Sequence, residues 1–370
     1  MEYQKINRRE FIKLSSLFIA GFSFLPLERK LSVLGSAFSL PDFPESGRLG
    51  RVSVGMVDIK VRPDLNSEAV GVLYEDAVVP WLRETVGSWP GRNNQRFVET
   101  PDGYIWSPYL QPVQNQPNQV VASLPSYDQE PGMWVEVSVP WTDMILINPP
   151  ARSHWLRARL EHDLPPRAYY NQILWVDQLK TDENGQVWYR INERYGNPGD
   201  IFWAPGKAFR MLTPEETSPI HPEVEDKRVV VDASWRGQYL SCYEGNEEVY
   251  FCRISSGVST GSTPVTPAGS DGFPIWRKLH SVHMAGGTNV EGWDLHGIGW
   301  TSLFVGEGVA IHSTFWHNNF GEPMSHGCVN ARPEDAKWVF RWTKPVVPFA
   351  SGDITISGAG STKVIVVDEL

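Results

Sequence analysis

One stretch of the chain, residues 311–330, combines a cysteine with three histidines. Cys328 follows a glycine, and His312, His317 and His326 all lie within sixteen positions before it. A free thiol with a pKa of about 8.5 is mostly protonated at neutral pH, so a nucleophilic cysteine needs an imidazole to take its proton. The glycine lets the backbone turn sharply and present amide N–H groups to a carbonyl oxygen. The stretch therefore predicts acyl transfer through a cysteine nucleophile.

Two other interpretations of Cys328 stay open at this point. Free cysteine is among the residue types most often buried, so a packed thiol is one alternative. A zinc site is the other, although such sites usually take closely spaced pairs of ligands and this region has no second cysteine. The uncommon tetrad from Ser325 to Cys328 favours catalysis over both. We expect neither a metal ion nor a cofactor.

At these residues the chain resembles the YkuD-like L,D-transpeptidases. Their signature is a histidine, a gap, and then Ser/Thr-His-Gly-Cys-x-Asn, which His312-Ser313 and Ser325-His326-Gly327-Cys328-Val329-Asn330 match. Upstream, Ser256-Gly257 and Thr266-Pro267-Ala268-Gly269 are similar to two further conserved segments of that family, with the usual phenylalanine displaced to Phe273. The resemblance covers about residues 227–356.

The resemblance implies an activity and a role for each signature residue. Cys328 would attack a carbonyl of a peptidoglycan stem peptide, and an amine of a neighbouring stem would resolve the thioester into a cell-wall crosslink. His312 would accept and return the proton, oriented by Ser313 through its backbone carbonyl. The alternatives are a hydrolase that trims stem peptides with the same pair of residues, and a wall-binding protein without catalysis.

The remaining signature residues would support the loop around the cysteine. His326 and Gly327 would line the oxyanion side together with the Cys328 amide. Asn330 would brace the loop, unless it is an ordinary turn residue. His317 has no counterpart in the family, and we expect it on the surface or facing the substrate.

Composition limits the class of protein. The chain has 370 residues, a formal net charge of −10 and a pI near 5.4, which argues against a nucleic-acid partner because such partners require a basic face. Its 16 tryptophans and 29 prolines favour short strands and turns. The length suggests two or three domains. We expect a mainly β protein, with two small SH3-like β-barrel modules followed by a β-rich L,D-transpeptidase catalytic domain that carries one or more short helices.

The N-terminus predicts an export signal over residues 1–37. The segment Asn7–Lys13 resembles the twin-arginine motif, and an apolar run to Leu27 follows it. That run is short for a membrane span, and cleavage after Ala37 is expected. An amphipathic first helix and an uncleaved membrane anchor are the alternatives. The signal implies a protein that acts outside the cytoplasm, in the cell envelope.

Short alternating segments before the catalytic domain predict the two modules, at residues 47–115 and 132–212. Hydrophobic spacing and aromatic residues in both resemble bacterial SH3-like domains, and the segment ending at Trp203 is similar to the one ending at Trp106. Most of the tryptophans are expected in the core; a groove for glycan or peptide is the alternative. Residues 117–131 and 213–222 are predicted linkers.

The catalytic domain is predicted over residues 226–357, with 358–370 as a C-terminal tail. Arg332–Trp342 has helical spacing, with proline and acidic residues in its first turn. A glycine-rich stretch near His283 is expected to be a mobile loop over the cleft. It places His280, His283 and His296 in that loop as exposed or cleft-facing residues.

Cys242 and Cys252 flank a predicted hairpin whose turn is Gly245-Asn246. A two-residue turn there places Cys242 opposite Val249, so the two cysteines are out of register. A disulfide between them is therefore the less favoured of two alternatives, the other being two free thiols.

Overall fold

The computed structural model describes residues 40–128, 130–259, 261–287, 292–306 and 308–368. The predicted export signal at residues 1–37 lies outside this part. The described chain is mainly β with three α-helices: α3 (His154–Glu161), α4 (Pro214–Thr217) and α5 (Pro333–Trp342). None of the helices in these ranges is long and apolar enough to cross a membrane.

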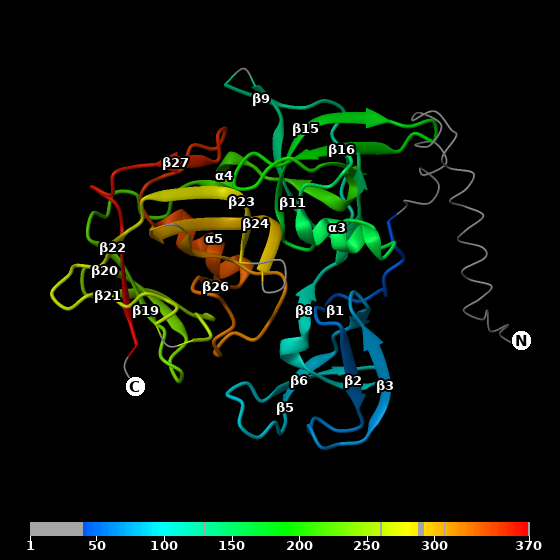
Figure 1. The fold of residues 1–370 in the computed structure, drawn as a ribbon, viewed down its shortest axis with the longest axis horizontal. Helices are drawn as coiled ribbons and strands as arrows, with labels where there is room; N and C mark the ends of the chain where they lie inside the picture. The colour runs from blue at the N-terminus through cyan, green and yellow to red at the C-terminus, as the bar shows by residue number, and fades with distance from the viewer. Residues whose placement is uncertain (1–39, 129, 260, 288–291, 307, 369–370) are drawn as a thin grey trace, which may run out of the picture.

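The first unit, residues 47–115, consists of two antiparallel sheets and lies at the bottom of Figure 1. The strand orders are β4-β1-β8 and β3-β2-β7-β6-β5. A short 3₁₀ turn, Ser107–Tyr109, leads into β8. The strands are β1 (Leu49–Val52), β2 (Met56–Lys60), β3 (Ala69–Tyr74), β4 (Val78–Pro80), β5 (Arg83–Val86), β6 (Arg96–Thr100), β7 (Gly103–Trp106) and β8 (Leu110–Val113).

The second unit, residues 132–212, is built on a six-stranded antiparallel sheet of order β13-β17-β16-β15-β11-β18. This unit also contains helix α3 and a separate two-stranded sheet formed by β12 and β14. The strands here and in the preceding segment are β9 (Ser126–Tyr127), β10 (Glu130–Pro131), β11 (Met133–Val137), β12 (Trp141–Asp143), β13 (Ile145–Leu146), β14 (Arg167–Tyr169), β15 (Ile173–Thr181), β16 (Val187–Asn192), β17 (Ile201–Pro205) and β18 (Phe209–Met211).

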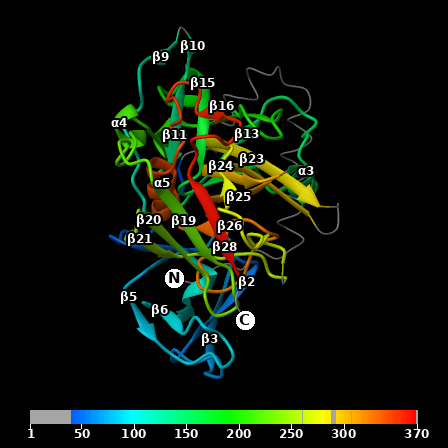
Figure 2. The ribbon, with the colours of Figure 1, turned by 90° about the vertical axis from the view of Figure 1, so that its left-hand side faces the viewer.

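The C-terminal part contains two five-stranded sheets, of order β21-β20-β19-β28-β22 and β26-β25-β24-β23-β27. It lies at the left of Figure 1, beside the other two units, and therefore faces the viewer in Figure 2. Its strands are β19 (Lys227–Asp232), β20 (Tyr239–Glu244), β21 (Glu247–Arg253), β22 (Phe273–Pro274), β23 (Arg277–Gly287), β24 (Gly292–Val305), β25 (Val309–Ser313), β26 (Val329–Ala331), β27 (Asp353–Thr355) and β28 (Lys363–Val367).

Helix α5 joins the core of this part through its apolar face. Pro333 occupies the first turn, where its missing N–H costs nothing, and Glu334 and Asp335 lie at the positive end of the helix dipole. Val339 and Phe340 are buried in a cluster that includes Trp300 of β24. The helix predicted from the sequence is confirmed within one residue of its start.

The hydrophobic clusters extend across the boundaries between units. Trp134 and Trp175 of the second unit lie in the same cluster as Trp300 and Phe340 of the C-terminal part. Leu49 of the first unit belongs to the main cluster of the second unit. The three parts therefore pack against one another through shared hydrophobic clusters and are not connected by linkers alone.

Two predictions about architecture are wrong. The closed barrels expected for the two units are not found, since in the described ranges each sheet order is open at both ends. Short alternating strands fit an open sheet equally well when a neighbouring unit covers it. The expected tail at 358–370 contains β28, which pairs in parallel with β19 in the register Arg228↔Lys363 to Asp232↔Val367. Its alternation of buried and half-buried residues is that of a sheet strand.

The hairpin near Gly245 forms with the predicted turn but a different register. Glu244 pairs with Glu247, and an irregularity after Cys242 then places Cys242 opposite Tyr250 instead of Val249. Cys242 and Cys252 are both free and buried. The sequence could not show this bulge, because its alternation is equally regular in both registers.

Candidate functional site

His312 lies on one strand near the edge of a sheet, and the cysteine immediately precedes the neighbouring strand. β25 carries His312, and β26 runs parallel to it in the register Ile311↔Val329 and His312↔Asn330. Cys328 is the residue immediately before β26, two positions before Asn330. Register partners, and residues two apart on a strand, share a face of the sheet. The sheet therefore presents His312 and Asn330 on the same side, and Cys328 lies in the bend that leads into β26.

His312 is held as a neutral base. Its Nδ1 lies 2.9 Å from the Ser313 carbonyl oxygen, and because a carbonyl can only accept, Nδ1 carries the proton. This is the contact that the family resemblance implied for Ser313. Burial lowers the pKa of His312 to about 4. At neutral pH its Nε2 is unprotonated and can accept a proton.

Cys328 is half-buried and rests as a thiol. Its Sγ donates to the carbonyl oxygen of Gly308, in the turn between β24 and β25, at 3.4 Å. Burial raises the pKa of Cys328, and the opposing effect of the Ala310 N–H is smaller. At rest the site therefore contains a neutral thiol and a neutral imidazole, with the thiol proton directed at Gly308.

A tight turn places the cysteine. Gly327 has a φ of 149°, and a Cβ there would lie 2.7 Å from the Ser262 carbonyl oxygen, so the position requires glycine. The Gly327 N–H donates to Ser325 Oγ at 3.0 Å, and that hydroxyl donates to the Cys328 carbonyl at 2.6 Å. The Gly327 N–H is thus bonded inside the turn, which argues against its expected role on the oxyanion side.

The upstream segment singled out in the sequence braces this turn. The Ser325 N–H donates to the Ser256 carbonyl, and the Val258 N–H donates to the Ser325 carbonyl, each at 2.9 Å. Thr263 Oγ1 donates to the Gly327 carbonyl at 2.9 Å. Both sides of the turn are fixed by the C-terminal domain itself.

The long hairpin of β23 and β24 reaches the same site. Trp293 of β24 stacks on the exposed ring of His326, with centroids 4.4 Å apart and an interplanar angle of 25°. His326 therefore presents its side chain to the hairpin. Sequence reasoning missed Trp293, because a single tryptophan among sixteen carries no mark of its partner.

His317 is not on the surface, contrary to expectation. Its Nδ1 accepts the Asn319 N–H at 3.2 Å, so the neutral ring carries its proton on Nε2. Asn330 Nδ2 lies 2.9 Å from that nitrogen, and because a protonated Nε2 needs an acceptor, we assign the amide with Oδ1 in this place, which also gives the buried oxygen a partner. Burial, followed by the nearby His312, lowers the pKa of His317 to about 3. This contact ties Asn330 to the segment between the two strands.

The expected mobile loop around His283 is also wrong, because these residues form β23 and β24. His283 lies between Glu193, 2.6 Å from Nδ1, and Asp294, 2.5 Å from Nε2. The two carboxylates outweigh burial and raise the pKa of His283 to about 10. His280 and His296 are buried as well. The glycine content predicted a loop, but these residues pair as the two strands of a hairpin.

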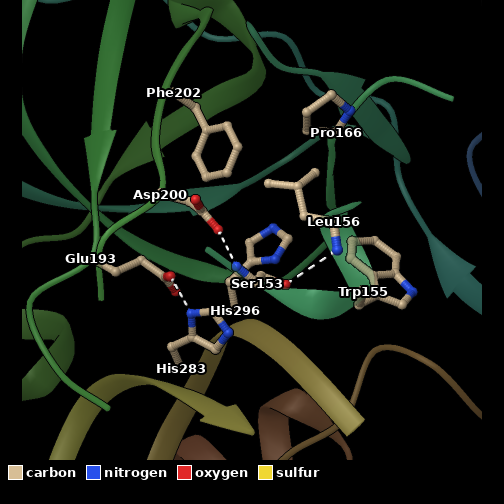
Figure 3. A pocket seen from close by; sticks show the side chains of 9 residues that line it. All are labelled: Ser153, Trp155, Leu156, Pro166, Glu193, Asp200, Phe202, His283 and His296. Atoms are coloured by element: carbon tan, nitrogen blue, oxygen red, sulfur yellow. Dashed lines mark hydrogen bonds and ion pairs between the residues drawn. The ribbon is translucent and has the colours of Figure 1, made fainter. Parts of the chain in front are cut away.

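Figure 3 shows a pocket around this histidine. His283 is directed at Glu193, and Ser153, the N-cap residue of α3, also lines the pocket. Asp200 accepts the N–H groups of Arg152 and Ser153 at 2.7 and 2.9 Å. The pocket shares no lining residue with the Cys328 site. The pocket is lined by residues of the second unit and of the β23–β24 hairpin, and it is separate from the predicted active site.

Comparison with known proteins agrees with the signature. Residues 226–366 match the model of the L,D-transpeptidase catalytic domain (YkuD). No curated protein matches the chain.

Similar solved structures include three bacterial L,D-transpeptidases. A cysteine-to-serine mutant of the Enterococcus faecium enzyme is 25% identical, with a TM-score of 0.28 over 40% of this chain and 52% of that one, so the chain spans about half its length. The enzyme from Mycobacterium smegmatis is 15% identical, with a TM-score of 0.30 over 51% and 98%. That from Stackebrandtia nassauensis is 18% identical, with a TM-score of 0.27 over 42% and 61%. From the match of residues 226–366, the C-terminal part of this chain is an L,D-transpeptidase catalytic domain of the YkuD family, preceded by a β-rich region of no assigned family.

Proposed function

We propose that the chain is an L,D-transpeptidase that crosslinks peptidoglycan stem peptides. The family consists of cysteine-dependent acyltransferases that act on this substrate. The observation that supports the proposal is the parallel pairing of β25, which carries a neutral His312, with β26, which begins immediately after a partly accessible Cys328. A purely structural thiol would need neither the solvent access nor the fixed imidazole tautomer.

The acylation step follows from the resting protonation states. The thiol proton of Cys328 passes to Nε2 of His312 as the sulfur attacks the stem-peptide carbonyl, and the Cys328 amide N–H donates to the developing oxyanion. Collapse of the tetrahedral intermediate breaks the C–N bond. The imidazolium returns its proton to the leaving amine, a terminal D-alanine by family resemblance, and a thioester remains.

The second half of the reaction decides between transfer and hydrolysis. An amine from a neighbouring stem attacks the thioester, gives its proton to His312 and expels the thiolate, which is then reprotonated. A thioester favours this outcome because an amine competes well with water once the site is closed. Trimming differs only in that water takes the place of the amine.

Incubation with purified muropeptides tests the proposal. Crosslinked dimers in the wild type, detected by mass spectrometry, support transfer, whereas shortened monomers alone would establish hydrolysis. Cys328→Ala should form no acyl-enzyme and no dimers while keeping the wild-type circular dichroism spectrum. If the wild type and Cys328→Ala leave the muropeptides equally unchanged, the protein is not catalytic on this substrate.

The location and the accessory units complete the proposal. A wall substrate implies an extracytoplasmic protein, and we propose export through residues 1–37 by the twin-arginine route. Residues 47–115 and 132–212 would be accessory units of the catalytic domain. Replacing Arg8 and Arg9 by lysine should leave the protein in the cytoplasm in a fractionation experiment. Normal export of that variant would refute this route.

A further inference from the structure

The segment from Thr314 to Gly327, here called the crossover, connects the His312 strand to Cys328. We propose that the first unit is a clamp that fixes the crossover, so that the unit acts as part of the active-site scaffold. This inference rests on the proposed function for its effect on catalysis, but its structural content stands on contacts alone. In Figure 1 the orange crossover runs down toward the cyan turn of the first unit.

The first contact grips the start of the crossover. Arg51 of β1 is buried, and its NH2 donates to the Phe315 carbonyl at 2.9 Å. Its NH1 and Nε donate to Asp76 at 2.7 Å and Gln111 at 2.9 Å. The guanidinium lies 4.2 Å from the ring centroid of Tyr169, which in turn stacks on Phe315. Phe315 is therefore held through both its backbone and its ring.

The second contact lies at the 3₁₀ turn of the first unit. Asn318 donates from Nδ2 to the Ser107 carbonyl at 3.3 Å and from its backbone N–H to the Pro108 carbonyl at 3.4 Å. Asn318 is 7% exposed, so these bonds replace water that it cannot reach.

The third contact is a buried carboxylate on the crossover. Glu322 is 3% exposed and accepts from Arg92 at 3.1 Å and from the Asn93 N–H at 2.7 Å. Among the described residues of its own domain, only the Asn319 side-chain amide donates to this carboxylate, at 3.4 Å. An ionised carboxylate is costly to bury without a charged partner. The position of Glu322 therefore depends on the first unit.

These contacts divide the crossover into two parts. The end near Cys328 is braced by Ser256 and Thr263 of the catalytic domain. The part from Phe315 to Glu322 is held by the first unit at Phe315, Asn318 and Glu322, and Ile254 and Ser255 of the catalytic domain add bonds to Gly321 and Asn319. His317, which tethers Asn330, lies inside this part. Loss of the clamp would thus loosen the connection that sets the relative placement of His312 and Cys328. Arg51, Arg92 and Ser107 are positioning residues in this scheme.

The test compares three arginine variants of the full chain. Arg92→Ala removes the charged partner of Glu322. Arg51→Lys keeps a positive charge near Asp76 but loses the planar fork that reaches several acceptors at once. Arg96→Ala is the matched control, because its ion pair with Glu84 lies within the first unit.

Hydrogen exchange, followed by mass spectrometry, measures how well the amides of the crossover are protected. The kinetics of crosslinking measure the effect of the crossover on catalysis. In Arg92→Ala and Arg51→Lys, the amides of residues 314–325 should exchange about tenfold faster than in the wild type. The turnover number should fall about tenfold to a hundredfold with little change in KM. Arg96→Ala should match the wild type in both measurements.

Unchanged exchange in both variants would overturn the clamp, as would equally fast exchange in Arg96→Ala. If the wild type forms no crosslinks, the proposed function fails, and hydrogen exchange still decides whether the clamp exists.

Discussion

The protonation states of two side chains define the resting site. Burial keeps His312 neutral, with a pKa of about 4, and raises the pKa of Cys328. Many cysteine enzymes instead rest as a thiolate paired with an imidazolium. Because the thiolate is also the form that peroxide oxidises, this site is expected to resist oxidation until a substrate arrives.

Alkylation of Cys328 by iodoacetamide measures this directly. The rate should rise about tenfold per pH unit from pH 6 to 9 without a plateau, because only the thiolate reacts and its fraction grows with pH. Mass spectrometry counts the label, and Cys328→Ala should take up none, since Cys242 and Cys252 are buried. A plateau near neutral pH would show an ion pair in place of two neutral groups.

Loss of the base should be as clear as loss of the nucleophile. His312→Ala should lower the crosslinking rate by about a hundredfold to ten-thousandfold, the usual contribution of a positioned general base. The measurement is dimer formation at saturating muropeptide. A loss below about tenfold would move the role to His326, because His317 is occupied at both nitrogens.

At the scale of elements, the β23–β24 hairpin connects the second unit to the site. Its buried anchor is His283, placed between Glu193 of the second unit's Asn192–Gly196 segment and Asp294, the neighbour of Trp293. The contact of His283 with Glu193 fixes the hairpin to the second unit, and its contact with Asp294 joins the two strands of the hairpin. The hairpin held in this way places Trp293 against His326. The raised pKa of His283 means that its stabilising effect is complete below about pH 6.5 and is lost as the pH rises toward 10.

His283→Gln should destabilise the fold by roughly 3–5 kcal/mol at pH 7, because it leaves the buried carboxylate of Glu193 and the half-buried carboxylate of Asp294 without a cation. Urea unfolding gives the free energy. His221→Gln is the matched control, since His221 pairs with Glu244 at the surface and should cost less than about 1 kcal/mol. Equal effects of the two substitutions would contradict the anchor.

The sequence predicted the elements that carry local signals. The signature located Cys328 and His312, and capping chemistry located α5. It could not show that His317 is buried or that His283 meets Glu193, because both depend on contacts far apart in the chain. The glycines near His283 led to the wrong prediction of a loop for the same reason. Glycine weakens a strand, but here the pairing of β23 with β24 offsets that loss of stability, and this pairing is visible only in the fold.

At the scale of the whole molecule, buried neutral histidines set the response to acid. Burial lowers the pKa of His280 to about 3, His312 to about 4 and His317 to about 3, whereas the unfolded chain titrates near 6.5. Below pH 6.5 the unfolded state binds more protons, so stability falls with falling pH. Three such groups give a slope of about 4 kcal/mol per pH unit between pH 6 and 4.5.

His280→Phe isolates one of these groups. The ring of His280 lies among Trp134, Trp300, Phe340 and Phe349, and neither of its nitrogens has a partner within the described chain. Phenylalanine should fit there and reduce the slope by about 1.4 kcal/mol per pH unit. Urea unfolding at pH 7, 6 and 5 measures it. An unchanged slope would show that His280 does not contribute.

The grip of the first unit on the crossover also bears on how such enzymes diverge and can be recombined. Arg51 and Arg92 belong to one unit, while Phe315 and Glu322 belong to another. A catalytic domain transplanted from a distant relative would arrive with a crossover that lacks its counterparts. Among descendants of this chain, substitutions at Arg92 and Glu322 should accordingly arise together, because their contact joins two side chains, and chimeras that keep this pair should outperform those that do not.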